Sequence, residues 1–305
     1  MNVLITGGTG LVGTRLSQLL TAAGHSVGHL TRGSGPSATA DRTFRWNPVA
    51  GEIDAAAVPW ADALVHLAGA GVLDERWTPA RKKEIVESRV RGLQVLRTAL
   101  ARNDHRVQVL VSASAIGLYG DRGDQWLTET TPPPAAGQDF LADVCVAWEA
   151  AALQIRATGL RVPLMRIGIV LSADGGALPE MARPVKLGAG APLGSGRQWT
   201  SWIHIDDLCR AFIAALTDAR YTGAYNAVGP APATNAELTR ALATELHRPL
   251  LLPAVPAFAL RLALGERAQA VLGSQRVRPT ALLEQGFAFA YPELAGALAN
   301  IYAAA

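Results

Sequence analysis

The sequence predicts an α/β protein: a doubly wound parallel sheet with helices on both faces, followed by a smaller, mostly helical C-terminal region. Two observations support this prediction. In the first half of the chain, short apolar runs rich in Val, Ile and Leu alternate with longer segments of helical periodicity. From residue 234 onward mostly helical segments remain, interrupted by prolines. Regular alternation indicates right-handed βαβ units and therefore a parallel sheet.

The first elements are the clearest. Residues 2–6 form an apolar strand, and residues 11–23 form a helix with Leu16, Leu19 and Leu20 on one face. Residues 27–30 form the second strand. The later elements repeat the pattern, with strands at 63–67, 107–112, 160–167 and 223–228 and helices at 81–102, 140–158 and 206–216.

The pattern becomes irregular after Gly168. Glycines and prolines crowd residues 172–200, and we expect this segment to form a loop-rich, lid-like excursion with glycine hinges. We therefore predict a nucleotide-binding domain over residues 1–228 and a substrate-side region over residues 229–305.

Length and charge narrow the class of protein. A chain of 305 residues fits one large domain or one domain with an appendage. The net charge of +3 gives no bias towards nucleic acid. No apolar run approaches the ~20 residues of a membrane span. We therefore expect neither a nucleic-acid nor a membrane partner.

Two further features concern the cellular compartment. The apolar start lacks a basic segment and is interrupted by glycines, so it predicts a buried strand and not a signal peptide. The two cysteines, Cys145 and Cys209, lack the spacing of a disulfide framework or a metal site. Both features predict a cytoplasmic protein without a bound metal.

A glycine-rich loop joins the first strand to the first helix. Residues 7–13 read GGTGLVG, in which Gly7 and Gly10 allow a tight turn and Gly13 allows helix and strand to pack closely. The helix N-terminus offers amide donors to a diphosphate. This placement predicts a Rossmann-type dinucleotide site. The predicted contacts in this loop are Gly7, Thr9, Gly10, Leu11 and Val12.

The end of the second strand indicates which dinucleotide binds. An acidic residue there would bind the ribose 2′-hydroxyl of NAD, but this strand ends in Thr31-Arg32, and the first carboxylate follows only at Asp41. A guanidinium matches a 2′-phosphate. We therefore predict NADP(H), with Thr31 and Arg32 at the adenosine ribose; the alternative is a surface arginine in a loop.

Motifs along almost the whole chain resemble one branch of the extended short-chain dehydrogenase/reductase superfamily. This branch is the atypical one described as NAD-dependent epimerase/dehydratase or "epimerase family protein", with a C-terminal domain of unknown function. The matching segments are 6–13 (TGGTGLVG), 66–69 (HLAG), 87–90 (ESRV), 112–120 (SASAIGLYG), 139–151, 166–171 (RIGIVL), 193–207, 226–238 and 286–287.

The resemblance implies further cofactor contacts. Leu67 and Ala68 would lie on the adenosine side, and Val170 near the nicotinamide. Glu84 and Arg89, on the long helix, match cofactor-contacting positions. For each the alternative stays open: Leu67 and Val170 as core residues, and the two charged residues as solvated helix positions.

The catalytic pattern of the superfamily is missing. Its members use Tyr-x-x-x-Lys, in which the tyrosine exchanges a proton with the substrate oxygen and the lysine lowers the tyrosine pKa. The only lysines here are Lys82, Lys83 and Lys186, and none follows a tyrosine at this spacing. Alignment of the helix on Trp148-Glu149 puts Leu141 and Cys145 at the two catalytic positions.

Part of the hydroxyl machinery remains. Ser114 matches the usual serine position, and Tyr119 follows it in the loop. We expect Ser114 to orient a carbonyl and Tyr119 to act as an acid; the alternative is that both are structural. His204 precedes a helix with an acidic first turn, where a docking role is expected more often than catalysis.

Two functions remain open. One is an NADP(H)-dependent oxidoreductase or epimerase-like enzyme acting on an unknown small carbonyl or hydroxyl substrate. The other is a non-catalytic NADP(H)-binding sensor or scaffold. The long helices 81–102 and 140–158 suit a homodimer interface but also suit a monomer.

Overall fold

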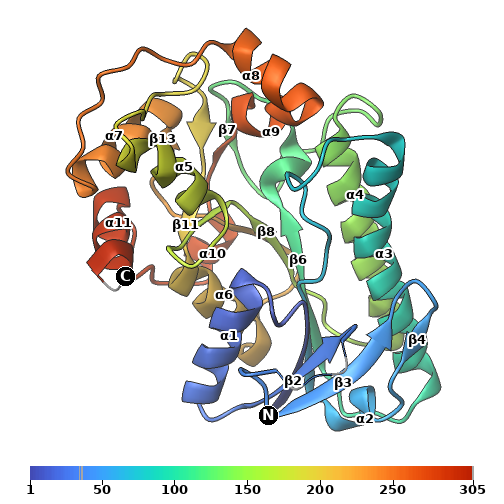
Figure 1. Ribbon diagram of the computed structural model, residues 1–305. Coiled ribbons are helices and arrows are strands. Elements are labelled where there is room, and N and C mark those ends of the chain that lie inside the picture. Colours follow the sequence, from blue (N-terminus) through green and yellow to red (C-terminus); the bar gives the residue numbers. More distant parts are fainter. Residues whose placement is uncertain (34, 36, 304–305) are drawn as a thin grey trace.

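A twisted eight-stranded sheet organises the molecule (Figure 1). The computed structural model describes residues 1–33, 35 and 37–303. The strand order is β12-β8-β6-β5-β1-β2-β3-β4, and every neighbouring pair is parallel except β3 and β4. The strands of this sheet are β1 (Asn2–Thr6), β2 (Ser26–Thr31), β3 (Arg42–Asn47), β4 (Glu52–Ile53), β5 (Ala63–His66), β6 (Val109–Ala115), β8 (Leu164–Ile167) and β12 (Ala224–Ala227).

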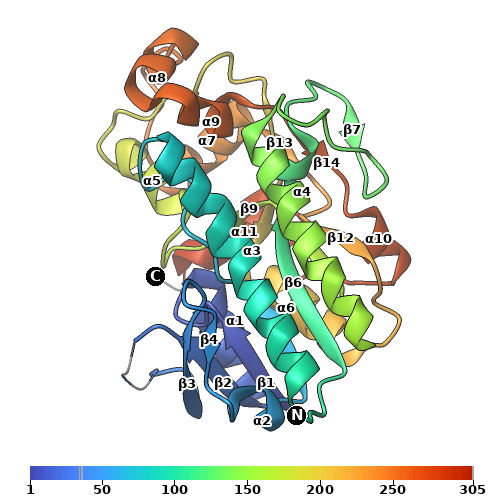
Figure 2. The same cartoon turned by 90° about the vertical axis from the view of Figure 1, so that its right-hand side faces the viewer.

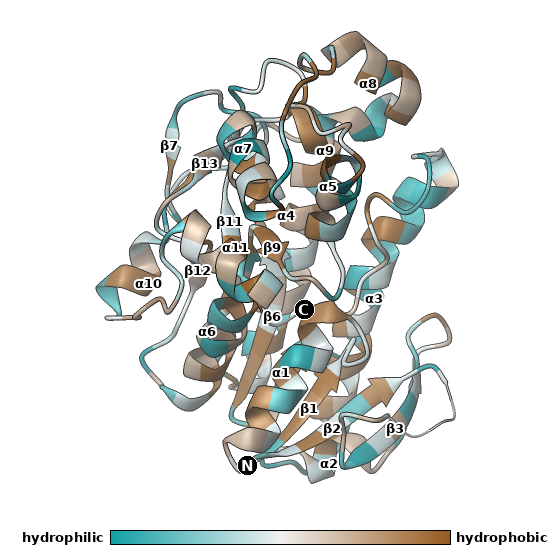
Figure 3. Cartoon of the chain, turned by 60° about the vertical axis from the view of Figure 1, so that its left-hand side comes forward, coloured by the Kyte–Doolittle hydropathy of each residue, from teal (hydrophilic) through white to brown (hydrophobic). Residues whose placement is uncertain are grey.

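Helices cover both faces of the sheet, as predicted. Helices α1 (Leu11–Ala22) and α6 (Ile205–Thr217) pack together on one face. Helices α3 (Pro79–Arg102) and α4 (Phe140–Leu153) lie side by side on the other, in front of the sheet in Figure 2. The strands between them are strongly hydrophobic (Figure 3), because a parallel sheet is buried on both faces.

The remaining strands have two or three residues each. Three two-stranded ladders pair β7 (Trp126–Leu127) with β14 (Arg276–Val277), β9 (Ile169–Leu171) with β11 (Trp202–His204), and β10 (Trp199–Thr200) with β13 (Ala233–Thr234). The other helices are α2 (Ala57–Trp60), α5 (Ala177–Lys186), α7 (Asn235–Glu245), α8 (Ala257–Leu264), α9 (Gln269–Leu272), α10 (Thr280–Glu284), α11 (Leu294–Ala303) and the 3₁₀ turns η1 (Ile116–Tyr119), η2 (Gln154–Thr158) and η3 (Gly265–Ala268).

Three sequence-based expectations about elements need correction. The segment expected to be loop-rich contains the ten-residue helix α5, which tolerates Pro184 in its last turn. Strand β3 was missed, although Phe44 and Trp46 are buried and alternate with the exposed Arg45. The helix predicted over 140–158 is α-helical only to Leu153 and then tightens into η2.

A buried carboxylate of α6 binds the backbone of the C-terminal segment. Asp207, at the start of α6, is fully buried and accepts hydrogen bonds from the backbone N–H groups of Ala290 (2.8 Å) and Tyr291 (2.9 Å). The ring of Tyr291 stacks on His204 at 3.9 Å between centroids. This contact confirms a docking role for the segment that contains His204.

Among the described residues, no helix combines the length and apolarity needed to cross a membrane.

Candidate dinucleotide site

The glycine loop between β1 and α1 leaves no room for side chains at two positions. Gly7 has φ +71°, and a Cβ added there would lie 2.9 Å from the backbone nitrogen of Ala68. A Cβ on Gly13 would lie 2.3 Å from the carbonyl oxygen of Gly7. Both distances are shorter than van der Waals contact. Glycine therefore allows the loop, the helix and the residues that follow β5 to approach one another.

The N-terminus of α1 keeps its amide donors available. Gly10 is the N-cap residue, no described side chain caps the helix, and the first turn holds no acidic residue. Helix α7 shows the contrast, because Thr234 and Glu237 form a full capping box there. The exposed Thr9 and Gly10 thus lead into a helix end suited to an anion.

Residues following β5 lie beside this loop. The hydroxyl of Thr6, the last residue of β1, accepts hydrogen bonds from the N–H groups of Leu67 and Ala68, each at 3.2 Å. On the other side, a Cβ on Gly176 would lie 3.0 Å from a methyl carbon of Leu11 and 3.9 Å from the carbonyl oxygen of Val170. The structure therefore brings together Leu67, Ala68, Val170 and the glycine loop.

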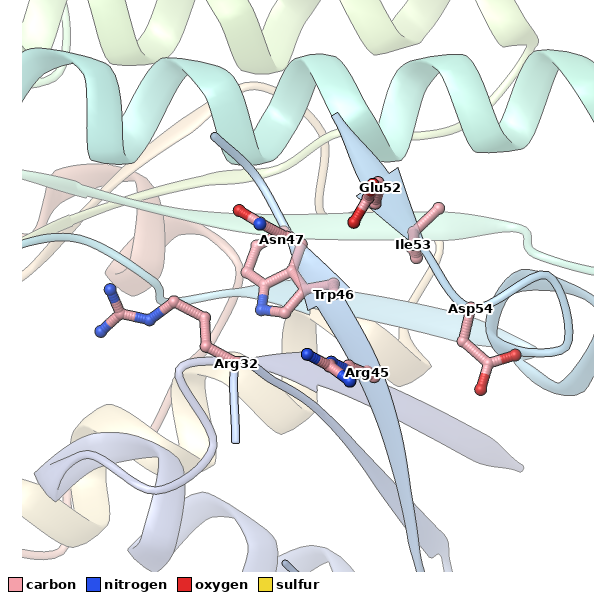
Figure 4. Close-up of a pocket in the computed structure, with 7 residues that line it drawn as sticks. All are labelled: Arg32, Arg45, Trp46, Asn47, Glu52, Ile53 and Asp54. Carbon is pink, nitrogen blue, oxygen red and sulfur yellow. The ribbon is translucent and has the colours of Figure 1, made fainter. Parts of the chain in front are cut away.

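Beyond the end of β2 the surface is hollowed. The hollow has a volume of about 580 Å³ and is lined by Arg32, Arg45, Trp46, Asn47, Glu52, Ile53 and Asp54 (Figure 4). Arg32 directly follows Thr31, the last residue of β2, and its side chain is exposed. It makes no ion pair with any residue that the structure describes.

The two charged residues predicted on the long helix differ in their surroundings. Glu84 is exposed and pairs with Arg81 at 2.8 Å. Arg89 is only 9% exposed; its Nη1 donates to the carbonyl oxygens of Ala70 (3.0 Å) and Ile85 (2.9 Å). No carboxylate in the described chain pairs with Arg89, so a buried positive charge supports the loop that follows β5.

Ser114 and Tyr119 lie in a buried hydrogen-bond network. The Ser114 hydroxyl donates to Glu149 at 2.7 Å, and the Tyr119 hydroxyl donates to Asn226 at 2.6 Å. Arg166 connects them, because it binds both oxygens of Glu149 and also donates to the Tyr119 oxygen at 3.0 Å. Neither hydroxyl-bearing residue is more than 1% exposed. Burial also raises the pKa of Tyr119.

The positions aligned with the catalytic tyrosine and lysine carry no ionised group. Leu141 is half-buried, and Cys145 is buried with no disulfide partner. Burial raises the pKa of the Cys145 thiol to about 12, so at neutral pH it stays protonated. Among the described residues, no cluster of three or more His, Cys, Asp or Glu side chains is arranged to hold a metal ion.

Sequence reasoning missed a residue beneath the glycine loop. The His29 ring lies against Gly8, where an added Cβ would sit 2.4 Å from the ring. Ser17 donates to the Gly13 carbonyl at 2.7 Å and lies 2.8 Å from Nε2 of His29. Burial lowers the pKa of His29, so a neutral imidazole supports the loop. The sequence could not show this contact, because it depends on how α1 packs against β2.

The strand order and the glycine loop define a Rossmann-type α/β protein of the class that binds dinucleotides. Within that class the chain belongs to the NAD dependent epimerase/dehydratase family, whose sequence model matches residues 3–228. Residues 255–301 match a domain of unknown function, DUF1731.

Similar proteins cover nearly the whole chain. The epimerase family protein Mb2239 of Mycobacterium bovis is 40% identical over 299 residues, which span 97% of this chain and 96% of that protein. The bovine epimerase family protein SDR39U1 is 37% identical over 307 residues, 99% of this chain and 100% of that protein. The solved structure of human SDR39U1 (isoform 2) with NADPH superimposes with a TM-score of 0.89 at 34% identity and covers 99% of both chains.

A more distant structure supports the fold alone. Thermus thermophilus UDP-glucose 4-epimerase in complex with NAD superimposes with a TM-score of 0.75 at 20% identity.

Proposed function

We propose that this protein binds NADP(H), with the diphosphate at the N-terminus of α1 and the 2′-phosphate at Arg32. The observation that carries the proposal is the glycine loop, which leads from β1 into an uncapped helix end. Strand β2, which pairs in parallel with β1, ends just before Arg32. NADPH in the human SDR39U1 structure supports the choice of cofactor.

In this proposal each part of the cofactor is bound by a different group of residues. Backbone amides of the glycine loop hold the diphosphate, Leu67 and Ala68 contact the adenosine side, and Val170 lies towards the nicotinamide. Arg89 holds the loop after β5 and supplies positive charge near it. Glu84 stays a proposed cofactor contact on α3, where its carboxylate is exposed and pairs with Arg81 at 2.8 Å. When bound, NADPH supplies a hydride.

Calorimetry tests the cofactor proposal. NADPH is expected to bind at least about tenfold more tightly than NADH, since hydrogen bonds to charged groups contribute about 1.5–3 kcal/mol. Arg32→Ala should remove this preference. Arg248→Ala, which removes an exposed arginine of the C-terminal region, is the matched control. Failure of both nucleotides to bind the wild type would refute the proposal.

We further propose that the protein is an oxidoreductase that acts on a small carbonyl or hydroxyl substrate. The support is the family and the site that presents a dinucleotide. The proposed roles of Ser114 and Tyr119 require their hydrogen bonds to Glu149 and Asn226 to open, because only then can both hydroxyls donate to a substrate oxygen.

A carbonyl screen with NADPH deuterated at C4 tests the activity, and label in the reduced product would establish it. Tyr119→Phe then tests the acid: an unchanged rate would exclude Tyr119 from proton transfer.

The burial of both hydroxyls favours a second candidate, a non-catalytic NADP(H) sensor. In that case NADPH and NADP⁺ must stabilise different conformations. Hydrogen exchange over residues 170–186 measures this difference. Equal protection with the two cofactors would remove the basis for a sensor.

A further inference from the structure

A second arginine enters the hollow at the end of β2. Strands β2 and β3 are parallel, and their register places Arg45 opposite Thr31, the residue before Arg32. Its neighbours Phe44 and Trp46 are buried, so the alternation of the strand directs Arg45 to the outer side. Figure 4 shows the Arg45 side chain from β3 in the same hollow as Arg32.

We propose that Arg45 is a second specificity-determining residue for the cofactor and contacts the 2′-phosphate together with Arg32. This inference rests on the proposed NADP(H) site. A phosphate monoester carries about −1.5 to −2 charges at neutral pH, so one guanidinium leaves it incompletely neutralised. Two guanidinium groups from adjacent strands balance that charge and contact its oxygens from two directions.

The charges around Arg45 support this role. No described carboxylate lies within ion-pair distance of Arg45 or Arg32, so neither guanidinium is neutralised by a side chain that the structure describes. Two acidic residues line the hollow. Asp54 is engaged, because its carboxylate accepts a hydrogen bond from the Ala56 N–H at 2.9 Å. Glu52, on β4, is exposed, and its attraction for Arg45 is the competing explanation for that arginine.

The test measures nucleotide affinity by calorimetry in the full-length chain. Arg45→Gln should weaken NADPH binding by about tenfold or more, the range expected when hydrogen bonds to a charged group are lost, and leave NADH within about twofold. Adenosine 2′-monophosphate, used as a competing probe, should lose affinity in parallel. Arg42→Gln is the control, because it removes the same charge from the exposed start of β3 outside the lining of the hollow.

The outcomes separate this inference from the cofactor proposal. Equal loss of NADPH and NADH affinity in Arg45→Gln, or a loss no larger than in Arg42→Gln, would overturn the inference. Arg45→Lys should restore part of the NADPH preference, and no restoration would also count against it. If wild type lacks any preference for NADPH, the cofactor proposal itself fails. The role of Arg45 alone fails if the wild type prefers NADPH, Arg32→Ala loses that preference and Arg45→Gln retains it.

Discussion

Single glycines set the geometry of the dinucleotide site at the residue scale. Gly13 lies in the first turn of α1, where the helix meets the loop, and its Cα faces the carbonyl oxygen of Gly7. The periodic spacing of glycines in the sequence predicted this requirement. The structure adds the partners, namely the Gly7 carbonyl on one side and the His29 ring beneath Gly8.

Gly13→Ala should destabilise the protein by about 1–3 kcal/mol, because overpacking forces the loop away from the helix. The added Cβ would lie 2.3 Å from the Gly7 oxygen. Urea unfolding measures the loss, and NADPH affinity should fall with it. Gly296→Ala, an exposed position of α11 with no atom near the added Cβ, should instead stabilise by about 0.5–1 kcal/mol. Equal effects at both positions would contradict the packing argument.

At the scale of elements, ion pairs join segments that are distant in sequence. Arg15 of α1 binds Asp206 of α6 through two nitrogens, at 2.6 and 2.9 Å. This pair holds α6 against the helix that begins the dinucleotide site. The buried Glu149–Arg166 pair similarly joins α4 to β8. A buried carboxylate without its partner is costly, and the Glu149 carboxylate is satisfied by Arg166 and by the hydroxyl of Ser114.

The pH dependence of the first pair is predictable. Arg15 lowers the pKa of Asp206 below its ordinary value of 3.8. A lowered carboxyl pKa stabilises the fold above 3.8, and this contribution is lost as the pH falls through the lower folded value. Asp206→Asn should therefore cost about 1 kcal/mol at pH 7 and progressively less in acid. Urea midpoints of the wild type and Asp206→Asn from pH 7 to pH 3 test this prediction. A difference between them that stays constant with pH would show that the Arg15–Asp206 pair does not cause the pH dependence.

At the scale of the whole molecule, neutral histidines are buried in the sheet domain. His66, at the end of β5, is fully buried and its Nδ1 lies 2.9 Å from the Thr6 hydroxyl. Burial lowers its pKa from 6.5 to about 4. Burial also lowers the pKa values of His29 and His204. The folded state thus resists protonation that the unfolded chain accepts.

Acid should therefore weaken the fold well above the range in which carboxylates titrate. A lowered histidine pKa stabilises above 6.5, and the contribution declines as the pH falls towards the folded value. For His66 alone the loss from pH 7 to pH 5 is about 2 kcal/mol, at about 1.4 kcal/mol per pKa unit. Urea unfolding of the wild type against His66→Asn measures this; parallel pH profiles would show that His66 is not responsible.

Much of the fold was predictable because it depends on local patterns. Apolar runs of strand length followed by helical periodicity identified β1, α1, β2, β5 and α3, and their alternation identified the parallel sheet. Glycine spacing located the loop after β1, and Arg32 was found because it directly follows an identifiable strand. The family followed from motifs spread along the chain and is confirmed.

Only the tertiary structure decided how distant residues combine. Strand β3 brings Arg45 next to Thr31 across fourteen positions of sequence, and no local pattern predicts that register. The same holds for Ser114 and Tyr119, for which the family resemblance left a catalytic and a structural role open. Their partners Glu149, Arg166 and Asn226 come from α4, β8 and β12, elements that are distant in sequence. The physical reason is that periodicity specifies which face of an element is buried, whereas hydrogen bonds between side chains depend on which elements become neighbours.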